Sequence, residues 1–317
     1  MPKVSVVIPI YNVEPYIERC LHSLFCQTLY DIEYLFVDDC STDSSINKIH
    51  NILEIYPNRK NQVRILRHNI NCGVGATRAT GIRNATGDYI IHCDPDDYVE
   101  LDIYERLYNK AVTENVDIVA CYFWMEYHGE SEIICKKYDS SPQSCLKNIY
   151  KKNKHSGALY DKLVRRELII NHDILPYEGC NYAEDFYCVI KIFYYARSLA
   201  VVELPLYHYC RREDSITMTP KNEYYWDIRR NVTDRICEFL RGKKIYETAC
   251  CQMRFYIKME YKSVFVGKEK EWFALYRESH DKIFKYDDMP LKGRIIWWLA
   301  LRSYFTYRIA KALIRGM

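Results

Sequence analysis

Apolar runs alternate with amphipathic stretches over the first hundred residues. Each run is followed by polar turn residues, and the segments between the runs repeat apolar residues at helical spacing, as at Ile17, Leu21 and Leu24. This alternation predicts an α/β fold with a Rossmann-like, mostly parallel sheet flanked by helices. Right-handed crossovers then bring the carboxyl ends of the strands to one edge of the sheet. The predicted strands cover residues 4–10, 32–37, 63–66 and 89–91.

Beyond residue 100 the alternation becomes less regular. We expect a helix over 101–113, a strand over 116–122, an excursion or hairpin over 126–142, and a strand pair at 201–204 and 207–210. From about residue 221 the pattern is helical. The sequence therefore predicts a domain over 1–220, with halves 1–100 and 101–220, followed by a helical C-terminal region over 221–317.

The last predicted helix, residues 292–315, combines aromatic, aliphatic and basic side chains and has no acidic ones. Such a helix is typical of one that lies on an anionic membrane surface. The alternative is a helix that packs on the rest of the chain or on a partner chain. At helical spacing one half carries basic residues together with apolar ones, namely Arg294, Trp298, Leu301, Arg302, Phe305, Arg308, Lys311 and Arg315.

Composition narrows the class of protein further. The formal charge of +3 over 317 residues gives no global argument for nucleic-acid binding. The fourteen cysteines form neither a Cys-x-x-Cys pair nor a zinc-spaced cluster, so we expect reduced thiols in a cytoplasmic protein. No signal peptide is evident, and no stretch approaches the roughly 20 apolar residues of a membrane span. A peripheral position on the inner membrane face remains open through the C-terminal region.

Three carboxylates follow the fourth predicted strand. Asp94, Asp96 and Asp97 surround Pro95, which cannot donate to a strand ladder and so favours a loop there. Carboxylates this crowded repel one another unless a cation joins them. Hard divalent ions such as Mg²⁺ or Mn²⁺ commonly bridge protein carboxylates to substrate phosphates. The alternative is a solvated acidic turn that caps the next helix.

The usual nucleotide-cofactor motifs are missing from the expected binding edge. The first strand is not followed by Gly-x-Gly-x-x-Gly, which argues against a nicotinamide or flavin cofactor, and there is no Walker A motif. Gly73-Val74-Gly75 alone is more often a tight loop. Phosphates bound here would depend on the carboxylate cluster and its metal for counter-charge.

Four motifs, in order, resemble those of family 2 glycosyltransferases. They are Val4 to Asn12, Val37-Asp38-Asp39-Cys40-Ser41-Thr42-Asp43, Asn71-x-Gly73 with Arg78, and Gly87-Asp88-Tyr89 running to Asp94-Pro95-Asp96-Asp97. The resemblance covers about the first hundred residues. It implies a glycosyltransferase A-type fold and an inverting enzyme of bacterial surface-polysaccharide assembly.

The resemblance also implies roles for individual residues. Tyr11 would pack on a nucleotide base, Asp39 would hydrogen-bond the edge of that base, and Asp94 and Asp96 would hold the ribose and the metal. The alternative for Tyr11 is a core tyrosine, and for Asp38 and Asp39 a strand-end turn and cap. The implied donor-binding residues are Pro9, Tyr11, Asp39, Asn71, Gly73, Arg78, Asp94, Lys162, Arg211 and Arg212, and the implied ligands of Mn²⁺ or Mg²⁺ are Asp94, Asp96 and Asp97.

The catalytic carboxylate is expected at Glu184-Asp185-Phe186, about 90 residues after the Asp-x-Asp pair. An inverting transferase needs one base to take the proton of the attacking hydroxyl. By the resemblance that base is Asp185, with Glu184 the alternative. Acidic residues that only stabilise a helix N-terminus are the competing interpretation. For Lys162, a solvated basic helix is as good an interpretation as a position near the diphosphate.

Two residues depart from the family pattern. Cys40 stands where the family usually has Gly, which is costly if the backbone there needs a positive φ. Pro95 replaces a small residue and stiffens the acidic loop without removing a ligand.

The resulting hypothesis is a metal-dependent inverting glycosyltransferase that moves a sugar from a nucleotide-diphosphate sugar, with UDP expected, to a saccharide or lipid-linked saccharide. The alternatives are a sugar nucleotidyltransferase and a non-catalytic nucleotide-sugar-binding subunit. A nucleotidyltransferase usually carries a glycine- and arginine-rich loop after its first strand, where this chain has Tyr11-Asn12-Val13-Glu14.

Overall fold

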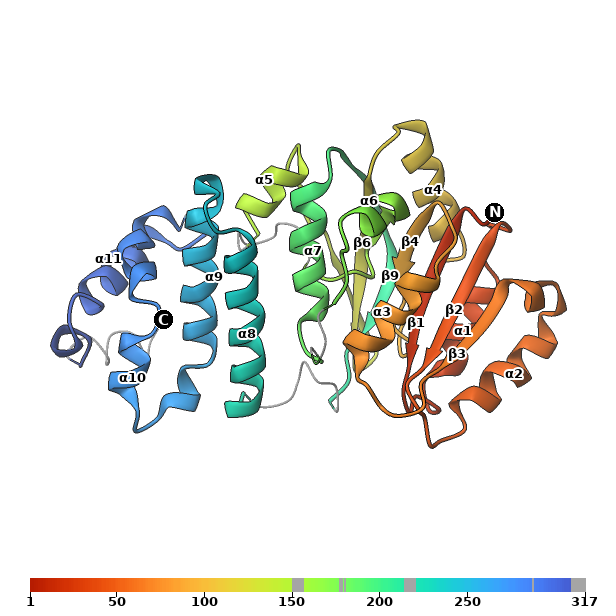
Figure 1. Ribbon diagram of the computed structural model, residues 1–317, viewed down its shortest axis with the longest axis horizontal. Coiled ribbons are helices and arrows are strands. Elements are labelled where there is room, and N and C mark those ends of the chain that lie inside the picture. Colours follow the sequence, from red (N-terminus) through yellow and green to blue (C-terminus); the bar gives the residue numbers. More distant parts are fainter. Residues whose placement is uncertain (150–156, 177–178, 180, 214–220, 287, 309–317) are drawn as a thin grey trace. The chain divides into compact units, whose positions relative to one another are not determined.

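The computed structural model describes residues 1–149, 157–176, 179, 181–213, 221–286 and 288–308 (Figure 1). Contacts divide the chain into two compact units. The α/β unit comprises residues 1–143 and 155–218, and the helical unit comprises residues 144–154 and 219–317. The functional halves expected within residues 1–220 remain a prediction.

A nine-stranded sheet in the described residues organises the α/β unit, with the order β3-β2-β1-β4-β8-β6-β9-β5 and β7 paired to β6. Strands β1 to β4 are mutually parallel, whereas β8, β5 and β7 pair antiparallel with their neighbours. The predicted Rossmann-like, mostly parallel sheet is confirmed. The strands are β1 Val4–Ile10, β2 Ile32–Asp38, β3 Val63–Arg67, β4 Tyr89–His92, β5 Tyr98–Val99, β6 Ile118–Tyr127, β7 Glu130–Ile134, β8 Lys162–Arg165 and β9 Leu199–Cys210.

Helices cover both faces of this sheet (Figure 1). Alternate residues of β1, including Val6 and Ile8, share a core with α1, α2 and α4. Val7 points to the other face, where α3 approaches so closely that a Cβ on Gly81 would lie 2.3 Å from the Val7 side chain. The helices of this unit are α1 Ile17–Phe25, α2 Ser45–Ile55, η1 Pro57–Gln62, α3 Val74–Asn84, α4 Ile103–Thr113, α6 Arg166–Asn171 and α7 Glu184–Tyr195. The residues of α5 Pro142–Lys147 are divided between the two units, with Ser144 the first that belongs to the helical unit.

The segment after residue 199 differs from the prediction of a strand pair. It forms one long strand, β9, which runs parallel to β6 and shifts register around Tyr122. Pro205 lies opposite Tyr122 in this irregular stretch. Because proline lacks the N–H that a ladder needs, a bulge bends the strand here instead of ending it.

The polar residues after β2 hold two neighbouring loops together. Helix α2 begins only at Ser45. Ser41 and Asp43 accept hydrogen bonds from the backbone N–H groups of Asn12 (3.2 Å) and Glu14 (2.9 Å), and Asp43 also accepts from the Ser45 N–H (3.0 Å) at the start of the helix. These side chains therefore fasten the loop after β1 to the loop after β2.

The helical unit packs around aromatic side chains. Phe255, Trp272, Tyr286 and Trp297 are buried in one cluster. The Asn222 side chain caps the first helix by accepting from the Tyr225 N–H (3.0 Å). Its helices are α8 Glu223–Phe239, η3 Lys244–Tyr246, α9 Glu247–Glu260, η4 Lys262–Phe265, α10 Glu269–Ala274, η5 Arg277–Lys285 and α11 Leu291–Ala300.

The expected continuous helix over 292–315 is interrupted. Helix α11 ends at Ala300 and a turn follows. Trp297, Leu301 and Tyr307 are buried in the core of the helical unit, because aromatic side chains gain most from leaving water. Lys311 and Arg315 lie outside the described residues. Among the helices that the structure describes, none is long and apolar enough to cross a lipid bilayer.

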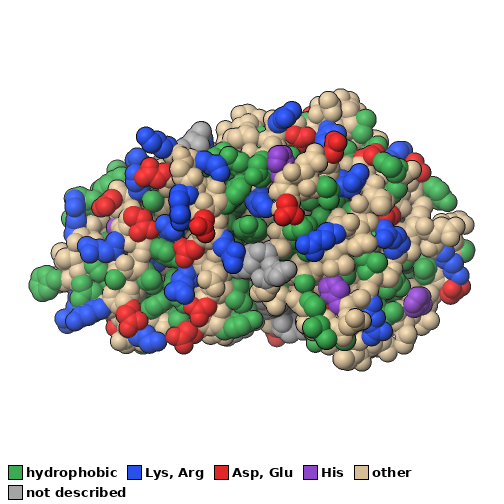
Figure 2. Space-filling view, in the orientation of Figure 1, with side chains coloured by type: hydrophobic (Ala, Val, Ile, Leu, Met, Phe, Trp, Pro, Cys, Tyr) green, Lys and Arg blue, Asp and Glu red, His purple; other side chains and the backbone are tan. Residues whose placement is uncertain are grey.

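The surface charges agree with the small formal charge of the chain. On the face seen in Figure 2, basic and acidic side chains are interspersed over the surface. This face has no large area of one sign that would attract a polyanion by charge alone.

Cys40 has a φ of 64°, in the left-handed region. A non-glycine residue in this region destabilises the fold by about 1–2 kcal/mol, because its Cβ lies close to the carbonyl oxygen that follows it. The family's usual glycine would avoid this strain, although it would lose more backbone entropy on folding.

We predict that Cys40→Gly raises the free energy of unfolding by about 0.5–1 kcal/mol, since the relieved strain exceeds the entropy cost. Thermal and urea unfolding would measure the gain. Cys40→Ala is the matched control, because it removes the sulfur and keeps the Cβ. Equal stabilities of the two variants would contradict the strain argument.

Candidate active site

A buried arginine connects three motifs at the carboxyl edge of the sheet. Arg78, in the middle of α3, donates from Nη2 to Asp94 Oδ1 (2.7 Å) and from Nε to Glu184 Oε1 (3.1 Å). Asp94 follows β4, and Glu184 begins α7. The predicted donor motif and the predicted catalytic motif therefore meet through a single guanidinium whose side chain is only 8% exposed.

The charged groups of the Asp94–Arg78–Glu184 bridge shift one another's pKa values. Burial alone would lower the pKa of Arg78, but the carboxylates of Asp94 and Glu184 outweigh it and hold the pKa above its ordinary value. Burial, with the nearby charge of Asp185, raises the pKa of Glu184 from 4.5 to about 7, although Arg78 opposes the shift. Glu184 is therefore poised to gain or lose a proton near neutral pH.

Asp185 occupies the next position of the same first turn. Its side chain is partly exposed, whereas Glu184 is buried. Ala183, immediately before them, has a φ of 61°, so the chain enters α7 through a strained left-handed residue. This entry separates the two acids into an inward-facing Glu184 and a more accessible Asp185.

Asp96 is paired with a residue from the end of the sheet. Arg212 donates from Nη2 to Asp96 Oδ2 (2.7 Å) and lies over the ring of Tyr16 at 4.0 Å. Burial and the charge of Asp94 raise the pKa of Asp96, and Arg212 acts against them. Arg211, by contrast, is exposed and lies over the Tyr127 ring at 5.3 Å.

Asp97 anchors the acidic loop of residues 94–97 to strand β9. It is 1% exposed, and its two oxygens accept from the Tyr207 hydroxyl (2.6 Å) and the Cys210 N–H (2.7 Å). Burial raises the pKa of Asp97 well above its usual range, and Asp96 and Asp94 add to the shift. Both oxygens are thus committed to β9, which differs from the expectation that Asp97 is a metal ligand.

Asp94 and Asp96 fit a hard divalent cation better. Their side chains are 25% and 21% exposed, so a ligand can reach them. Asp94 also raises the pKa of Asp96, which shows that the two carboxylates repel each other. Two accessible carboxylates on one short loop offer the oxygen donors that Mn²⁺ or Mg²⁺ prefers.

Asp39 holds the loop before α3. Its carboxylate accepts from the N–H groups of Cys72 (2.8 Å) and Gly73 (2.6 Å) and lies 2.7 Å from His68 Nδ1. Gly73 has a φ of 85°, and a Cβ there would overlap the Asn181 side chain. Only glycine therefore lets the loop turn and lets Asn181 lie against it.

Three further residues expected in the donor site lie near the carboxyl ends of β1 and β3, namely Pro9, Tyr11 and Asn71. Tyr11, just after β1, is 47% exposed and available for stacking, whereas Pro9 is buried within β1. Asn71 accepts from the Gly73 N–H (3.1 Å).

Lys162 differs from both sequence-based interpretations. It lies in strand β8 with no exposed surface, and its ammonium donates to Asp161 Oδ1 (2.6 Å) and the Ala158 carbonyl (2.8 Å). Pairing with Asp161 stabilises a cation that burial would otherwise destabilise. It is therefore neither on a solvated helix nor open to a diphosphate.

Sequence reasoning missed several residues that shape this edge. Tyr207 connects Asp97 to the Asp94 N–H (3.1 Å), and Asn181 and His68 lie against the glycine loop. Asn181 could have been found from its place three residues before Glu184. Tyr207 gave no such signal, because an aromatic residue in a strand usually belongs to the core.

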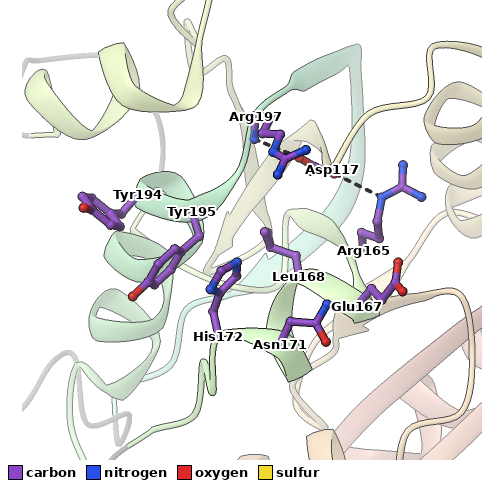
Figure 3. Close-up of a pocket in the computed structure, with 9 residues that line it drawn as sticks. All are labelled: Asp117, Arg165, Glu167, Leu168, Asn171, His172, Tyr194, Tyr195 and Arg197. Carbon is purple, nitrogen blue, oxygen red and sulfur yellow. Dashed lines mark hydrogen bonds and ion pairs between the residues drawn. The ribbon is translucent and has the colours of Figure 1, made fainter.

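The pocket in Figure 3 is lined by residues that include Asp117, just before β6, Arg165, at the end of β8, and Arg197, just before β9. Asp117 there accepts from Arg165 Nε (3.1 Å) and from the Arg197 N–H (2.8 Å), and His172 stacks on Tyr195. Arg165 pairs with Tyr89, the first residue of β4, whereas Asp94 follows the last. This pocket is therefore separate from the candidate active site.

Known proteins of similar sequence include several glycosyltransferases. The chain is 32% identical to the "Uncharacterized glycosyltransferase EpsJ" of Bacillus subtilis over 226 residues, which are 69% of this chain and 64% of the relative. It is 34% identical to the "Putative glycosyltransferase EpsH" of the same organism, over 66% of this chain and 60% of the relative. The matches thus cover about three-fifths of the length of these relatives. A "Cholesterol galactosyltransferase" of Borreliella burgdorferi is 29% identical over 97% of this chain and 95% of the relative.

Solved structures share the fold at lower identity. Residues 1–349 of Staphylococcus aureus TarS superpose with a TM-score of 0.72 at 20% identity, covering 99% of this chain and 92% of that one. The same protein has been solved in complex with UDP-GlcNAc (TM-score 0.70, 20% identity, 99% and 92% covered). The mannosyltransferase PcManGT of Pyrobaculum calidifontis, in complex with GDP-Man and Mn²⁺, has a TM-score of 0.58 at 15% identity, with 98% and 84% covered.

Residues 5–169, just over half of the chain, match the family described as Glycosyl transferase family 2. This stretch contains the loops after β1, β2 and β4 together with Arg78. On this match, the chain belongs to glycosyl transferase family 2.

Proposed function

We propose that this protein is a metal-dependent, inverting glycosyltransferase that uses a UDP-sugar and transfers the sugar to a saccharide or lipid-linked saccharide. The observation that carries the proposal is the Asp94–Arg78–Glu184 bridge, which joins the donor motif to the catalytic motif. Solved neighbours in complex with UDP-GlcNAc, and with GDP-Man and Mn²⁺, support a nucleotide-sugar donor.

The nucleotide would bind along the loops after β1 and β2. Tyr11 offers an exposed ring for stacking on the base. Asp39 is buried in the free protein and accepts from the Gly73 N–H, so one of its carboxylate oxygens would exchange that partner for the edge of the base when the nucleotide binds. Asn71 and Gly73 would then lie beside the ribose, because the turn that they form would bring its backbone groups close to the nucleotide.

The diphosphate would lie over the acidic loop. Asp94 and Asp96 would hold Mn²⁺ or Mg²⁺, which supplies positive charge to the leaving diphosphate when bound. Arg212 pairs with Asp96 in the free protein, and a diphosphate offers it a second anionic partner. Arg211, exposed beside it, can contact the same group, and Arg78 keeps Asp94 in place.

Asp185 would be the general base. It is partly exposed at the start of α7, so an acceptor hydroxyl can approach it and transfer its proton during attack on the anomeric carbon. Glu184 is buried and bound to Arg78, and it would position that guanidinium. A single displacement of this kind inverts the anomeric configuration.

Two alternative functions are less well supported. A sugar nucleotidyltransferase does not account for the family match over residues 5–169. A non-catalytic nucleotide-sugar-binding subunit does not account for an accessible Asp185 beside the Arg78 bridge, and the variant described below separates it from an enzyme.

Peripheral attachment to an anionic membrane is part of the proposal for a lipid-linked acceptor. On α11, Leu291, Ile295 and Leu299 are exposed at four-residue spacing, and Lys292 and Arg302 are exposed next to them. An exposed aliphatic stripe with basic neighbours suits the surface of an acidic bilayer. The setting would be the cytoplasmic face, during assembly of a surface polysaccharide.

We predict that UDP binds at least tenfold more tightly with Mn²⁺ than without it, and more tightly than GDP. Calorimetric titration would measure the affinities. Asp94→Asn and Asp96→Asn should remove the gain from Mn²⁺, because each deletes a charged ligand. Asp102→Asn, a partly exposed acid outside the loop, should leave it unchanged. Absence of UDP binding under every metal condition would refute the donor site.

Replacing the general base should separate catalysis from binding. Asp185→Asn is expected to slow transfer about 10²–10⁴-fold, the usual contribution of general base catalysis, with UDP affinity within twofold of the original. Release of UDP from a panel of UDP-sugars would measure the rate. Asp173→Asn, at an exposed site, is the control. Unchanged transfer by Asp185→Asn would assign the base elsewhere, with Glu184 the first candidate.

The raised pKa of Glu184 predicts a pH-dependent contribution to stability. Because the pKa of the folded protein is about 7 rather than 4.5, the folded state binds more protons between these values. The contribution is complete below pH 4.5 and is lost as the pH rises through 7. The free energy of unfolding should thus fall with pH more steeply in the original protein than in Glu184→Gln.

Thermal unfolding between pH 5 and pH 8 would test this difference. The exposed Glu203→Gln provides a matched control, and its curve should parallel that of the original protein. A Glu184→Gln curve that is also parallel would show that Glu184 keeps an ordinary pKa.

A further inference from the structure

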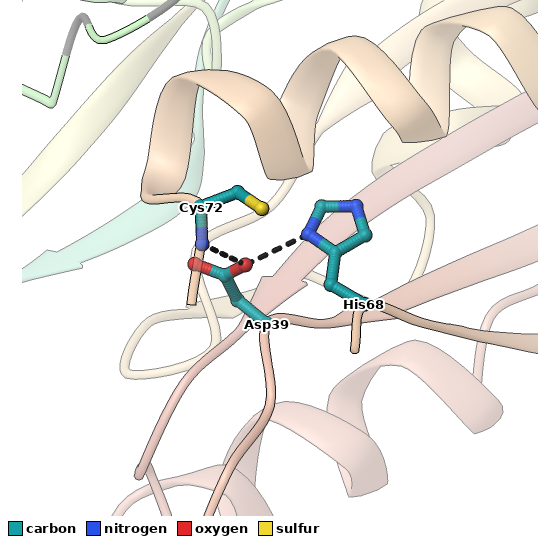
Figure 4. A group of neighbouring side chains, drawn as sticks. All are labelled: Asp39, His68 and Cys72. Atoms are coloured by element: carbon teal, nitrogen blue, oxygen red, sulfur yellow. Dashed lines mark hydrogen bonds and ion pairs between the residues drawn. The ribbon is translucent and has the colours of Figure 1, made fainter. Parts of the chain in front are cut away.

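A second cluster of metal-ligand type lies beside the donor loop. Asp39, His68 and Cys72 each offer one ligand atom, and the three atoms lie within 4.8 Å of one another (Figure 4). Figure 4 shows the thiol and the imidazole pointing toward the same region beside the Asp39 carboxylate. Cys72 is exposed, which leaves a path for an ion from solvent.

The distances suit a small tetrahedral ion. Zn²⁺ bonds of about 2.0–2.3 Å to oxygen, nitrogen and sulfur put pairs of ligand atoms about 3.3–3.7 Å apart. In the structure His68 Nδ1 lies 2.7 Å from Asp39 Oδ1, and the largest separation is within 4.8 Å. The His68–Asp39 contact would widen by about 0.6 Å and the exposed Cys72 side chain would move inward by about 1 Å to form the site.

The second nitrogen of His68 is already held. Nε2 lies 2.9 Å from the hydroxyl of Thr80, in α3. A hydroxyl can donate or accept, so it suits either tautomer of the ring. Metal-bound histidines usually have such a partner on their other nitrogen, which fixes the orientation of the ring.

The chemistry of the three groups selects the type of ion. A carboxylate and a thiolate together neutralise a divalent charge, and the neutral imidazole adds a third donor. A cysteine sulfur binds Zn²⁺ and similar late transition-metal ions in preference to Mn²⁺ or Mg²⁺, which prefer oxygen ligands. The cluster is therefore distinct in selectivity from the pair Asp94 and Asp96.

We infer that Asp39, His68 and Cys72 form a binding site for a zinc-type cation. We further infer that the bound ion closes the donor site in the sense that it prevents the nucleotide from binding there. The second part rests on the proposed function, in which Asp39 contacts the nucleotide base. Coordination would engage the Asp39 carboxylate and draw the loop at Cys72 toward it, so that the base would lose its partner. Zinc would act as an inhibitor that competes with UDP.

Cobalt titration of the full chain tests the site itself. Co²⁺ replaces Zn²⁺ in sites of this type, and a cobalt–thiolate bond gives a near-ultraviolet charge-transfer band. The original protein should show this band with a one-to-one end point. Cys72→Ser should abolish it, and His68→Asn should weaken cobalt binding at least tenfold. Cys135→Ser, which removes another exposed cysteine, should change neither.

Two results would overturn the metal site: no band in the original protein, or a band that persists in Cys72→Ser. Circular dichroism and the melting temperature of Cys72→Ser would verify that it is folded, which the exposure of this side chain favours.

UDP titration in Mn²⁺, with and without equimolar Zn²⁺, tests the effect on the donor site. Zinc should weaken UDP binding at least tenfold in the original protein and leave Cys72→Ser unchanged. Equal weakening in both would indicate that zinc acts at Asp94 and Asp96 instead and would overturn the closure. Absence of UDP binding even without zinc would overturn the proposed function and the closure together, while the cobalt spectrum still decides the metal site.

Discussion

The site depends on one buried cation. Arg78 lies between the carboxyl groups of Asp94 and Glu184, and a buried guanidinium is stable only while such partners stay close to it. Removing both would leave a buried charge uncompensated. The loop after β4 and the first turn of α7, nearly a hundred residues apart in the chain, are therefore held in register by the same side chain. This requirement explains why a residue of the donor motif also governs the geometry at Glu184.

A second layer of polar contacts supports that bridge. Asp97 and Tyr207 join the acidic loop to β9, and Asp39 joins β2 to the loop before α3. In each case a buried acid accepts backbone N–H groups that would otherwise be unsatisfied. The loops at this edge are thus ordered by their own acidic side chains. The acids of these motifs consequently divide into some that shape the edge and others, Asp94, Asp96 and Asp185, that remain accessible to ligands.

The same rule, that a buried charge needs a partner, explains where charge is tolerated inside the α/β unit. Lys162 and Asp161 are both fully buried, and each is the partner of the other. A pattern of basic residues in the sequence looks identical whether it faces water or is paired inside. The helical unit gives a parallel case, since the segment expected on a membrane buries Trp297 and Tyr307 in its own core and leaves a different, aliphatic stripe exposed.

Local patterns were sufficient for the parallel strands β1 to β4 and for the edge at which their following loops meet. Continuous apolar runs such as Val4–Ile10 can only be strands buried on both faces, and parallel strands with right-handed crossovers must collect their following loops at one edge. Tyr11, Asp39 and Asp94 could therefore be assigned to one edge from strand order, whereas Arg78 was assigned there only by the family resemblance.

Tertiary structure decided what each polar residue does there. Whether Asp97 faces a ligand or Tyr207, whether Lys162 meets a phosphate or Asp161, and whether His68 and Cys72 approach Asp39 depend on contacts between segments far apart in the chain. Hydrophobic periodicity and the handedness of the crossovers can be inferred from the amino-acid pattern, so that pattern was enough to bring these loops to one edge. Which polar groups pair with one another there depends on burial and on neighbours far away in the chain, which periodicity does not specify.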